Sequence, residues 1–178
     1  MNLPNKLTIL RVIMIIPFVI FMLTDLGGDA GRWIALALFC IASFTDFLDG
    51  YIARSRNIVT NFGKFMDPLA DKLLVCSAML CLMDSGKIPV WAVIVIMSRE
   101  FIIQGFRTVA ADNGVVIAAS YWGKFKTVSQ MLMIILMICD FSVLRITTVV
   151  VMYIAVVLTI ISLVDYIIKN AYVLKENK

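Results

Sequence analysis

Apolar runs long enough to cross a lipid bilayer follow one another along this chain, with only short polar turns between them. Hydrophobic residues make up 62% of the 178 residues, whereas a soluble domain is usually about 45–50% apolar. Because an open sheet cannot satisfy its backbone polar groups in lipid, we expect an all-α integral membrane protein. At roughly 20 residues per span, the chain has room for six transmembrane helices. They are expected at residues 7–24, 32–55, 64–84, 88–111, 121–140 and 144–168.

The first apolar run has a basic start, with Lys6 and Arg11, which is also typical of a signal peptide. Pro17 interrupts that run, and no small-residue cleavage site follows it. We therefore expect this span to be retained as the first of the six.

The basic residues predict the orientation of the spans. Of the 16 Lys and Arg residues, all but Arg32, Lys87 and Arg145 fall at one set of span ends. The positive-inside rule therefore predicts a protein of the cytoplasmic membrane with both termini in the cytoplasm. Because the net charge of +4 follows this topology, it does not indicate a nucleic-acid partner.

Histidine is absent, which excludes histidine-based zinc hydrolases, Ser-His-Asp hydrolases and histidine-ligated haem proteins. A general base then has to be a carboxylate, lysine, tyrosine or cysteine. The four cysteines lie in apolar runs without metal-ligand spacing, so we interpret them as reduced packing residues. They are Cys40, Cys76, Cys81 and Cys139.

Four aspartates lie at helical spacings in the second and third spans: Asp46, Asp49, Asp67 and Asp71. Each isolated carboxylate near a bilayer centre costs roughly 2.5–3.5 kcal/mol on the insertion scale. A divalent cation offsets this cost, because it neutralises the acids and prefers oxygen ligands. The i, i+3 and i, i+4 spacings place each pair on one face of its helix. Four such ligands can hold two Mg²⁺-type ions, which suit in-line displacement at phosphorus.

Small residues and an arginine accompany the acids. Gly50, Ala53 and Gly63 let a backbone or a ligand approach closely, and Arg54 offers a planar fork for phosphate oxygens. A rise of about 1.5 Å per residue places the acids in the inner leaflet, open to the cytoplasm. In the structural alternative, the acids pair with Arg54 and neighbouring lysines inside the membrane.

In chain order these residues read Asp46-x2-Asp49-Gly50-x2-Ala53-Arg54-x8-Gly63-x3-Asp67-x3-Asp71. The pattern resembles the signature of the CDP-alcohol phosphatidyltransferases at every position. The resemblance implies a six-span dimeric enzyme with two metals, which moves a phosphatidyl group from a CDP-linked lipid to an alcohol and releases CMP. It implies Asp46, Asp49 and Asp67 as metal ligands, and Asp71 as a further ligand and the base. For the CDP-diacylglycerol site it implies Gly50, Arg54 and Thr60, to which we add the small residues Ala53 and Gly63.

Flanking segments resemble the phosphatidylglycerolphosphate synthase branch of that family. They are residues 2–11, residues 63–74, Ser98-Arg99-Glu100 with Arg107, and residues 118–120 leading to residues 123–127. The resemblance covers about residues 2–130, and the last two spans are generic apolar sequence. It implies sn-glycerol 3-phosphate as the acceptor alcohol.

Four basic residues are expected to bind the phosphate of this acceptor. They are Arg99, Arg107, Lys124 and Lys126. Positive-inside anchoring is the alternative for the two lysines, and neutralisation by Glu100 is the alternative for Arg99. Asn5 and Thr8 are expected either to contact the nucleotide of CDP-diacylglycerol or to cap the first span.

We therefore expect one transmembrane catalytic domain, at residues 1–178, with its active site on the cytoplasmic side. The resemblance implies that it transfers phosphatidyl from CDP-diacylglycerol to sn-glycerol 3-phosphate, giving phosphatidylglycerol phosphate and CMP. The expected cofactor is a pair of divalent cations, Mg²⁺ with Mn²⁺ as the alternative, and the expected assembly is a homodimer among membrane lipids. Another acceptor, such as inositol phosphate, serine or phosphatidylglycerol, would keep the same fold. A divalent-cation transporter is the alternative from another class, because it also places paired acids in the membrane.

Overall fold

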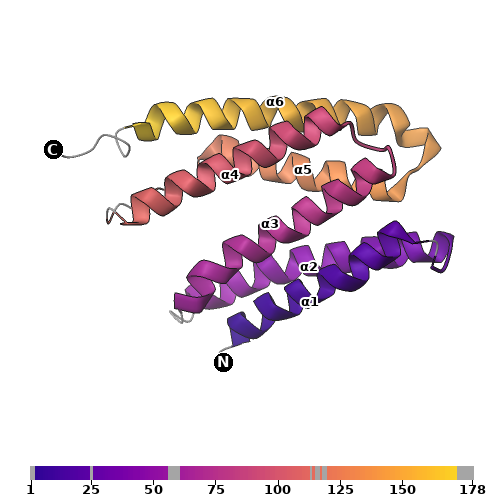
Figure 1. Ribbon diagram of the computed structural model, residues 1–178, viewed down its shortest axis with the longest axis horizontal. Helices are drawn as coiled ribbons and strands as arrows, with labels where there is room; N and C mark the ends of the chain where they lie inside the picture. Colours follow the sequence, from indigo (N-terminus) through magenta and orange to yellow (C-terminus); the bar gives the residue numbers. More distant parts are fainter. Residues whose placement is uncertain are drawn as a thin grey trace. The chain divides into compact units, whose positions relative to one another are not determined.

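The computed structural model describes residues 3–24, 26–55, 61–112, 114, 117 and 120–171. Within these ranges the description leaves out the side chains of residues 3, 4, 47, 49–55, 61, 62, 64, 65 and 112. Every described element is a helix, which confirms the expected all-α fold (Figure 1). The elements are α1 (Leu3–Leu23), α2 (Asp29–Ser55), α3 (Asn61–Asp84), α4 (Val90–Asp112), α5 (Tyr121–Cys139), the short η1 (Ser142–Leu144) and α6 (Arg145–Asn170).

Each of the six long helices corresponds to one expected span, with ends that differ by a few residues. Three stretches of the described chain are long and apolar enough to cross a membrane, namely Asn5–Leu23, Tyr121–Cys139 and Ser142–Asn170. The chain is therefore an all-α membrane protein. Crossing of the membrane by α2, α3 and α4 stays a prediction.

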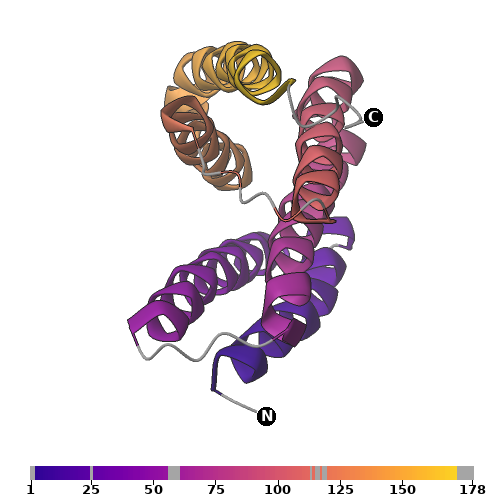
Figure 2. The same ribbon diagram turned by 90° about the vertical axis from the view of Figure 1, so that its left-hand side faces the viewer.

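The chain divides into two compact units, Met1–Lys87 and Ile88–Lys178. In the first unit, α1 packs against both α2 and α3 (Figures 1 and 2). The fully buried rings of Phe18 on α1 and Phe39 on α2 have their centroids 5.9 Å apart. Ala35 and Ala42 are also fully buried and share a helical face with Phe39. These small residues let the helices approach closely, which positions the polar ends of α1, α2 and α3.

A tight turn joins α1 to α2. Gly27 and Gly28 have φ values of 83° and 52°, which lie in the left-handed region that favours glycine. Gly31 follows in the first turn of α2, where an added Cβ would lie only 2.2 Å from the carbonyl oxygen of Leu26. The sequence Gly-Gly-Asp-Ala-Gly therefore fits this turn for steric reasons.

In the second unit, α5 and α6 lie side by side and α4 packs against α6 (Figure 2). The turn after α5 passes through Asp140, which has a φ of 48°, and whose N–H donates to the carbonyl of Leu136 at 3.1 Å. The buried faces of α5 and α6 are mostly apolar, and they include Met133, Ile134, Met137 and Ile138 on α5 and Met152, Ala155, Val156 and Thr159 on α6.

Candidate active site

Acids from two helices lie near each other in the first unit. Asp46 of α2 and Asp67 of α3 are both partly exposed, and their carboxylates are close enough to repel each other electrostatically. Asp71 follows Asp67 by one turn of α3 and is also partly exposed. The structure thus brings together acids that the sequence places in separate spans.

α1 supplies a hydrogen-bond donor to each of these two helices. Nη1 of Arg11 donates to Oδ1 of Asp46 at 2.6 Å, and the Thr8 hydroxyl donates to Oδ1 of Asp67 at 2.6 Å. Arg11 and Thr8 have no exposed surface. Because a buried charge is costly unless it is paired, Arg11 and Asp46 depend on each other.

The sequence interpretation gave these α1 residues other roles. It treated Arg11 as a topological charge, and it left Asn5 and Thr8 between nucleotide contact and helix cap. The capping alternative is wrong, because α1 begins at Leu3 and both residues lie inside it. The spacing of these residues is the sign of them in the sequence. Asn5, Thr8 and Arg11 share one face of a mostly apolar helix, and all three are buried.

Other residues of the motif are described only in part. The backbone of α2 continues to Ser55, but the side chains of Asp49, Gly50, Ala53 and Arg54 lie outside the described residues, as does Thr60. Gly63 is buried in the first turn of α3. The roles expected for these residues stay predictions.

The acids that are described suit a hard divalent cation. Among the described side chains, no three His, Cys, Asp or Glu residues form one metal-binding group, and Asp49 is not among them. Mg²⁺ usually takes only one or two protein carboxylates together with substrate phosphates and water. Asp46 and Asp67 each have a second carboxylate oxygen beyond the bonded Oδ1. The donor set therefore fits such a cation.

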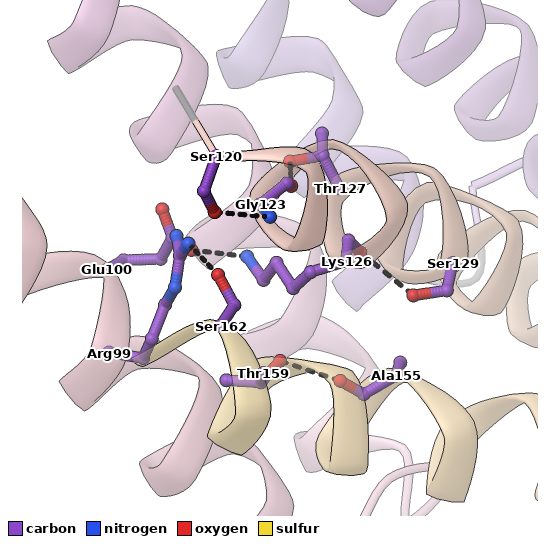
Figure 3. Close-up of polar contacts among 10 residues, drawn as sticks. All are labelled: Arg99, Glu100, Ser120, Gly123, Lys126, Thr127, Ser129, Ala155, Thr159 and Ser162. Carbon is purple, nitrogen blue, oxygen red and sulfur yellow. Dashed lines mark hydrogen bonds and ion pairs between the residues drawn. The ribbon is translucent and has the colours of Figure 1, made fainter. Parts of the chain in front are cut away.

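A buried polar cluster in the second unit connects α4, α5 and α6 (Figure 3). Nη1 of Arg99 donates to Oε1 of Glu100 at 2.9 Å, and Nη2 donates to the Ser162 hydroxyl at 2.6 Å. Nζ of Lys126 donates to the same Oε1 of Glu100. The side chains of Arg99, Glu100 and Lys126 are only 10%, 15% and 3% exposed. Among the described side chains, one carboxylate pairs with two cations, so these three residues together carry a net positive charge.

The N-terminus of α5 lies beside this cluster (Figure 3). The N–H of Gly123 donates to the Ser120 hydroxyl at 3.1 Å, and a Cβ on Gly123 would lie 3.5 Å from Nη2 of Arg99. Nε of Arg99 is buried and has no hydrogen-bond partner among the described residues. A positive helix end and an unused guanidinium donor are features that suit an anion.

Two of the four expected acceptor residues lie on the surface instead. Arg107 and Lys124 are exposed, and Nζ of Lys124 lies 5.3 Å from the ring centroid of Tyr121. Within the described contacts, neither residue joins the cluster. The sequence interpretation missed Ser162, which lies in a span treated as generic apolar sequence. In the sequence, the one feature that could have indicated Ser162 is a hydroxyl on the face of α6 that is otherwise mostly apolar.

A family model described as CDP-alcohol phosphatidyltransferase matches residues 1–161. The chain belongs to this family. A CDP-diacylglycerol--glycerol-3-phosphate 3-phosphatidyltransferase from Bacillus subtilis is 43% identical over 99% of this chain and 98% of its own length. Relatives of the same name from Rickettsia typhi and Haemophilus influenzae are 40% and 39% identical, over 93% of this chain and 94% and 91% of their own lengths.

CDP-alcohol phosphatidyltransferases generally depend on divalent cations. The match covers the acids of α2 and α3 as well as the basic residues of α4 and α5. This chain is therefore a phosphatidyl-transferring enzyme of the membrane.

Proposed function

We propose that this CDP-alcohol phosphatidyltransferase transfers phosphatidyl from CDP-diacylglycerol to sn-glycerol 3-phosphate, giving phosphatidylglycerol phosphate and CMP. The observation that carries the proposal is the approach of Asp46 and Asp67 from two helices inside the region that matches the family. The names of the relatives support the same acceptor, because they specify glycerol 3-phosphate over nearly the whole length of this chain.

Asp46, Asp49, Asp67 and Asp71 are the residues proposed to hold two divalent cations, Mg²⁺ or alternatively Mn²⁺. Bound there, the cations would neutralise the diphosphate and the charge that develops on the leaving CMP. In the proposed reaction, Asp71 accepts the proton of the primary hydroxyl of glycerol 3-phosphate. The hydroxyl oxygen then bonds to the lipid-side phosphorus, and the bond from that phosphorus to the CMP oxygen breaks with its electron pair on CMP. Arg54, which follows the first two acids in the motif, is proposed to stabilise the charge on the leaving phosphate.

The remaining contacts of CDP-diacylglycerol are proposed to come from the small residues of the motif and from α1. They are Asn5, Gly50, Ala53, Thr60 and Gly63. Asn5 is 8% exposed. Glycine or alanine at positions 50, 53 and 63 lets a phosphate approach the backbone, and Thr60 offers a hydroxyl. A nucleotide contact of Thr8 stays a prediction, beside the hydrogen bond that its hydroxyl donates to Asp67.

The acceptor phosphate is proposed to bind at the basic residues of the second unit. Arg99 and Lys126 are the main candidates, because they are buried, share Glu100 and retain a net positive charge. Arg107 and Lys124 are exposed, so they are proposed as the outer part of this site, where they attract the doubly charged acceptor. A neutral or zwitterionic alcohol would not need two buried cations.

We propose further that residues 1–178 act as one catalytic domain in a homodimer. The active site and both termini are proposed to face the cytoplasm, in the cytoplasmic membrane. This orientation rests on the distribution of basic residues along the chain.

The proposed reaction is tested with purified protein in detergent, Mg²⁺ and CDP-diacylglycerol, by measuring CMP release while the alcohol is varied. We expect CMP release with glycerol 3-phosphate and much less with inositol phosphate, serine or phosphatidylglycerol. Preference for another alcohol would overturn the assignment of glycerol 3-phosphate as the acceptor, but not the transfer of phosphatidyl from CDP-diacylglycerol. Absence of CMP release with every alcohol, together with Mn²⁺ uptake into proteoliposomes, would favour the transporter.

A further inference from the structure

We propose that Thr8 is a positioning residue for Asp67: its hydroxyl holds one carboxylate oxygen and thereby presents the other to a divalent cation. The inference rests on the proposed function only in taking Asp67 as a metal ligand. It makes α1 a part of the metal site and not only a membrane span.

The contact between Thr8 and Asp67 joins two helices of the first unit. Oγ1 of Thr8 lies 2.6 Å from Oδ1 of Asp67, and the two residues are 59 positions apart in the chain. Thr8 has no exposed surface, so water does not compete for its hydroxyl. A short bond from a buried neutral donor to a carboxylate is charge-assisted and restricts the rotation of the carboxylate.

Other threonines of this protein show what a helical threonine does by default. Its hydroxyl donates to the backbone carbonyl one turn earlier in the same helix. Thr108, Thr127, Thr148 and Thr159 all make this bond. The Thr8 hydroxyl donates to a side chain of another helix. The bond to Asp67 differs from the bonds of those four threonines, because it joins two helices.

The two acids receive different kinds of donor from α1. Arg11 gives Asp46 a full positive charge, whereas Thr8 gives Asp67 a neutral hydrogen bond. A neutral donor does not compensate the charge of a carboxylate, so this hydrogen bond fixes the orientation of Asp67 and leaves its charge for a cation. Removing a hydrogen bond that orients a metal-ligating group typically costs about 10–100-fold in metal affinity.

The test measures Mn²⁺ binding to the full-length protein in detergent, with Mn²⁺ alone as the probe and the free ion quantified by electron paramagnetic resonance. Thr8→Val removes the donor at nearly constant volume, and Thr8→Ser keeps it. Thr159→Val is the matched control, because Thr159 is equally buried but donates to Ala155 of its own helix at 2.6 Å. We expect about 10–100-fold weaker Mn²⁺ binding for Thr8→Val, and wild-type affinity for Thr8→Ser and Thr159→Val.

Three results would overturn the proposal. The first is wild-type Mn²⁺ affinity in Thr8→Val, above all if CMP binding in EDTA is weakened, which would make Thr8 a nucleotide contact. The second is unchanged Mn²⁺ binding in Asp67→Asn. The third is failure of both Thr8→Val and Thr8→Ala to fold in EDTA while Thr159→Val folds, since the hydroxyl would then serve only to join α1 to α3. CMP release by the wild-type protein tests the proposed reaction separately from all of these.

Discussion

Arg11 is a charged side chain without exposed surface, and its ion pair with Asp46 compensates for that burial. Removing one partner of a buried pair leaves the other uncompensated, at a cost of about 3–5 kcal/mol. The lower end of this energy range applies here, because the Asp46 side chain is 41% exposed and water solvates its carboxylate. Arg32 forms a surface ion pair instead. Its Nη2 lies 3.6 Å from Oδ1 of Asp29, whose side chain is 93% exposed, and such surface pairs contribute about 0–1 kcal/mol to the free energy of unfolding.

Arg11→Met is therefore expected to lower the free energy of unfolding by about 3 kcal/mol, and Arg32→Met by less than about 1 kcal/mol. Thermal unfolding in detergent with EDTA measures both. Arg11→Met combined with Asp46→Asn should be more stable than Arg11→Met alone, because the carboxylate that lost its Arg11 partner is then neutral. Equal losses in the two arginine variants would show that Arg11 is not a buried counter-charge.

Asp71 is proposed as the base, so Asp71→Asn should reduce kcat by about 10²–10⁴-fold, the usual contribution of a positioned base. Binding of CDP-diacylglycerol should change much less, because the amide keeps the size of the side chain. Steady-state CMP release gives kcat, and equilibrium binding gives the affinity. A parallel loss of CDP-diacylglycerol affinity would mean that Asp71 acts chiefly as a metal ligand.

At the scale of elements, the α1–α2 turn fixes how the polar end of α1 reaches the acids of α2. The first turn of α2 lies close to the Leu26 carbonyl oxygen, and only glycine fits at position 31. A Cβ there would lie 2.2 Å from that oxygen. Gly105 in α4 is different, since nothing lies within 4 Å of an added Cβ. Glycine is therefore required sterically at position 31 but not at position 105.

Gly31→Ala should destabilise the protein by about 1–3 kcal/mol, the usual cost of overpacking. Gly105→Ala should stabilise it by about 0.5–1 kcal/mol, because alanine loses less conformational entropy in a helix. Both are read from thermal unfolding in the same detergent. A neutral Gly31→Ala would show that the turn relaxes easily.

At the scale of the whole molecule, hydropathy predicted all six helices, because burial in lipid requires long apolar runs. The spacing of the aspartates predicted that the acids of α2 share one face of that helix and the acids of α3 one face of theirs. Partners across helices were not predictable, because they depend on which faces pack together. Thr8 and Asp67 are 59 positions apart, and Arg99 and Ser162 are 63 positions apart. No local pattern contains such a pair. This is why the sequence did not predict the Thr8–Asp67 and Arg99–Ser162 contacts.

The acids and the buried cations belong to different compact units, so their variants should affect the two substrates separately. Lys126→Met removes one of the two described cations that pair with Glu100, and with it the net positive charge of the three described side chains. A charge-assisted contact is worth about 1.5–3 kcal/mol, so the KM for glycerol 3-phosphate should rise at least about tenfold. The KM for CDP-diacylglycerol should change little. Lys169→Met is the control, because Lys169 is 64% exposed and pairs with Asp165. Equal rises in both KM values for Lys126→Met would mean that the cluster supports the fold and does not bind the acceptor.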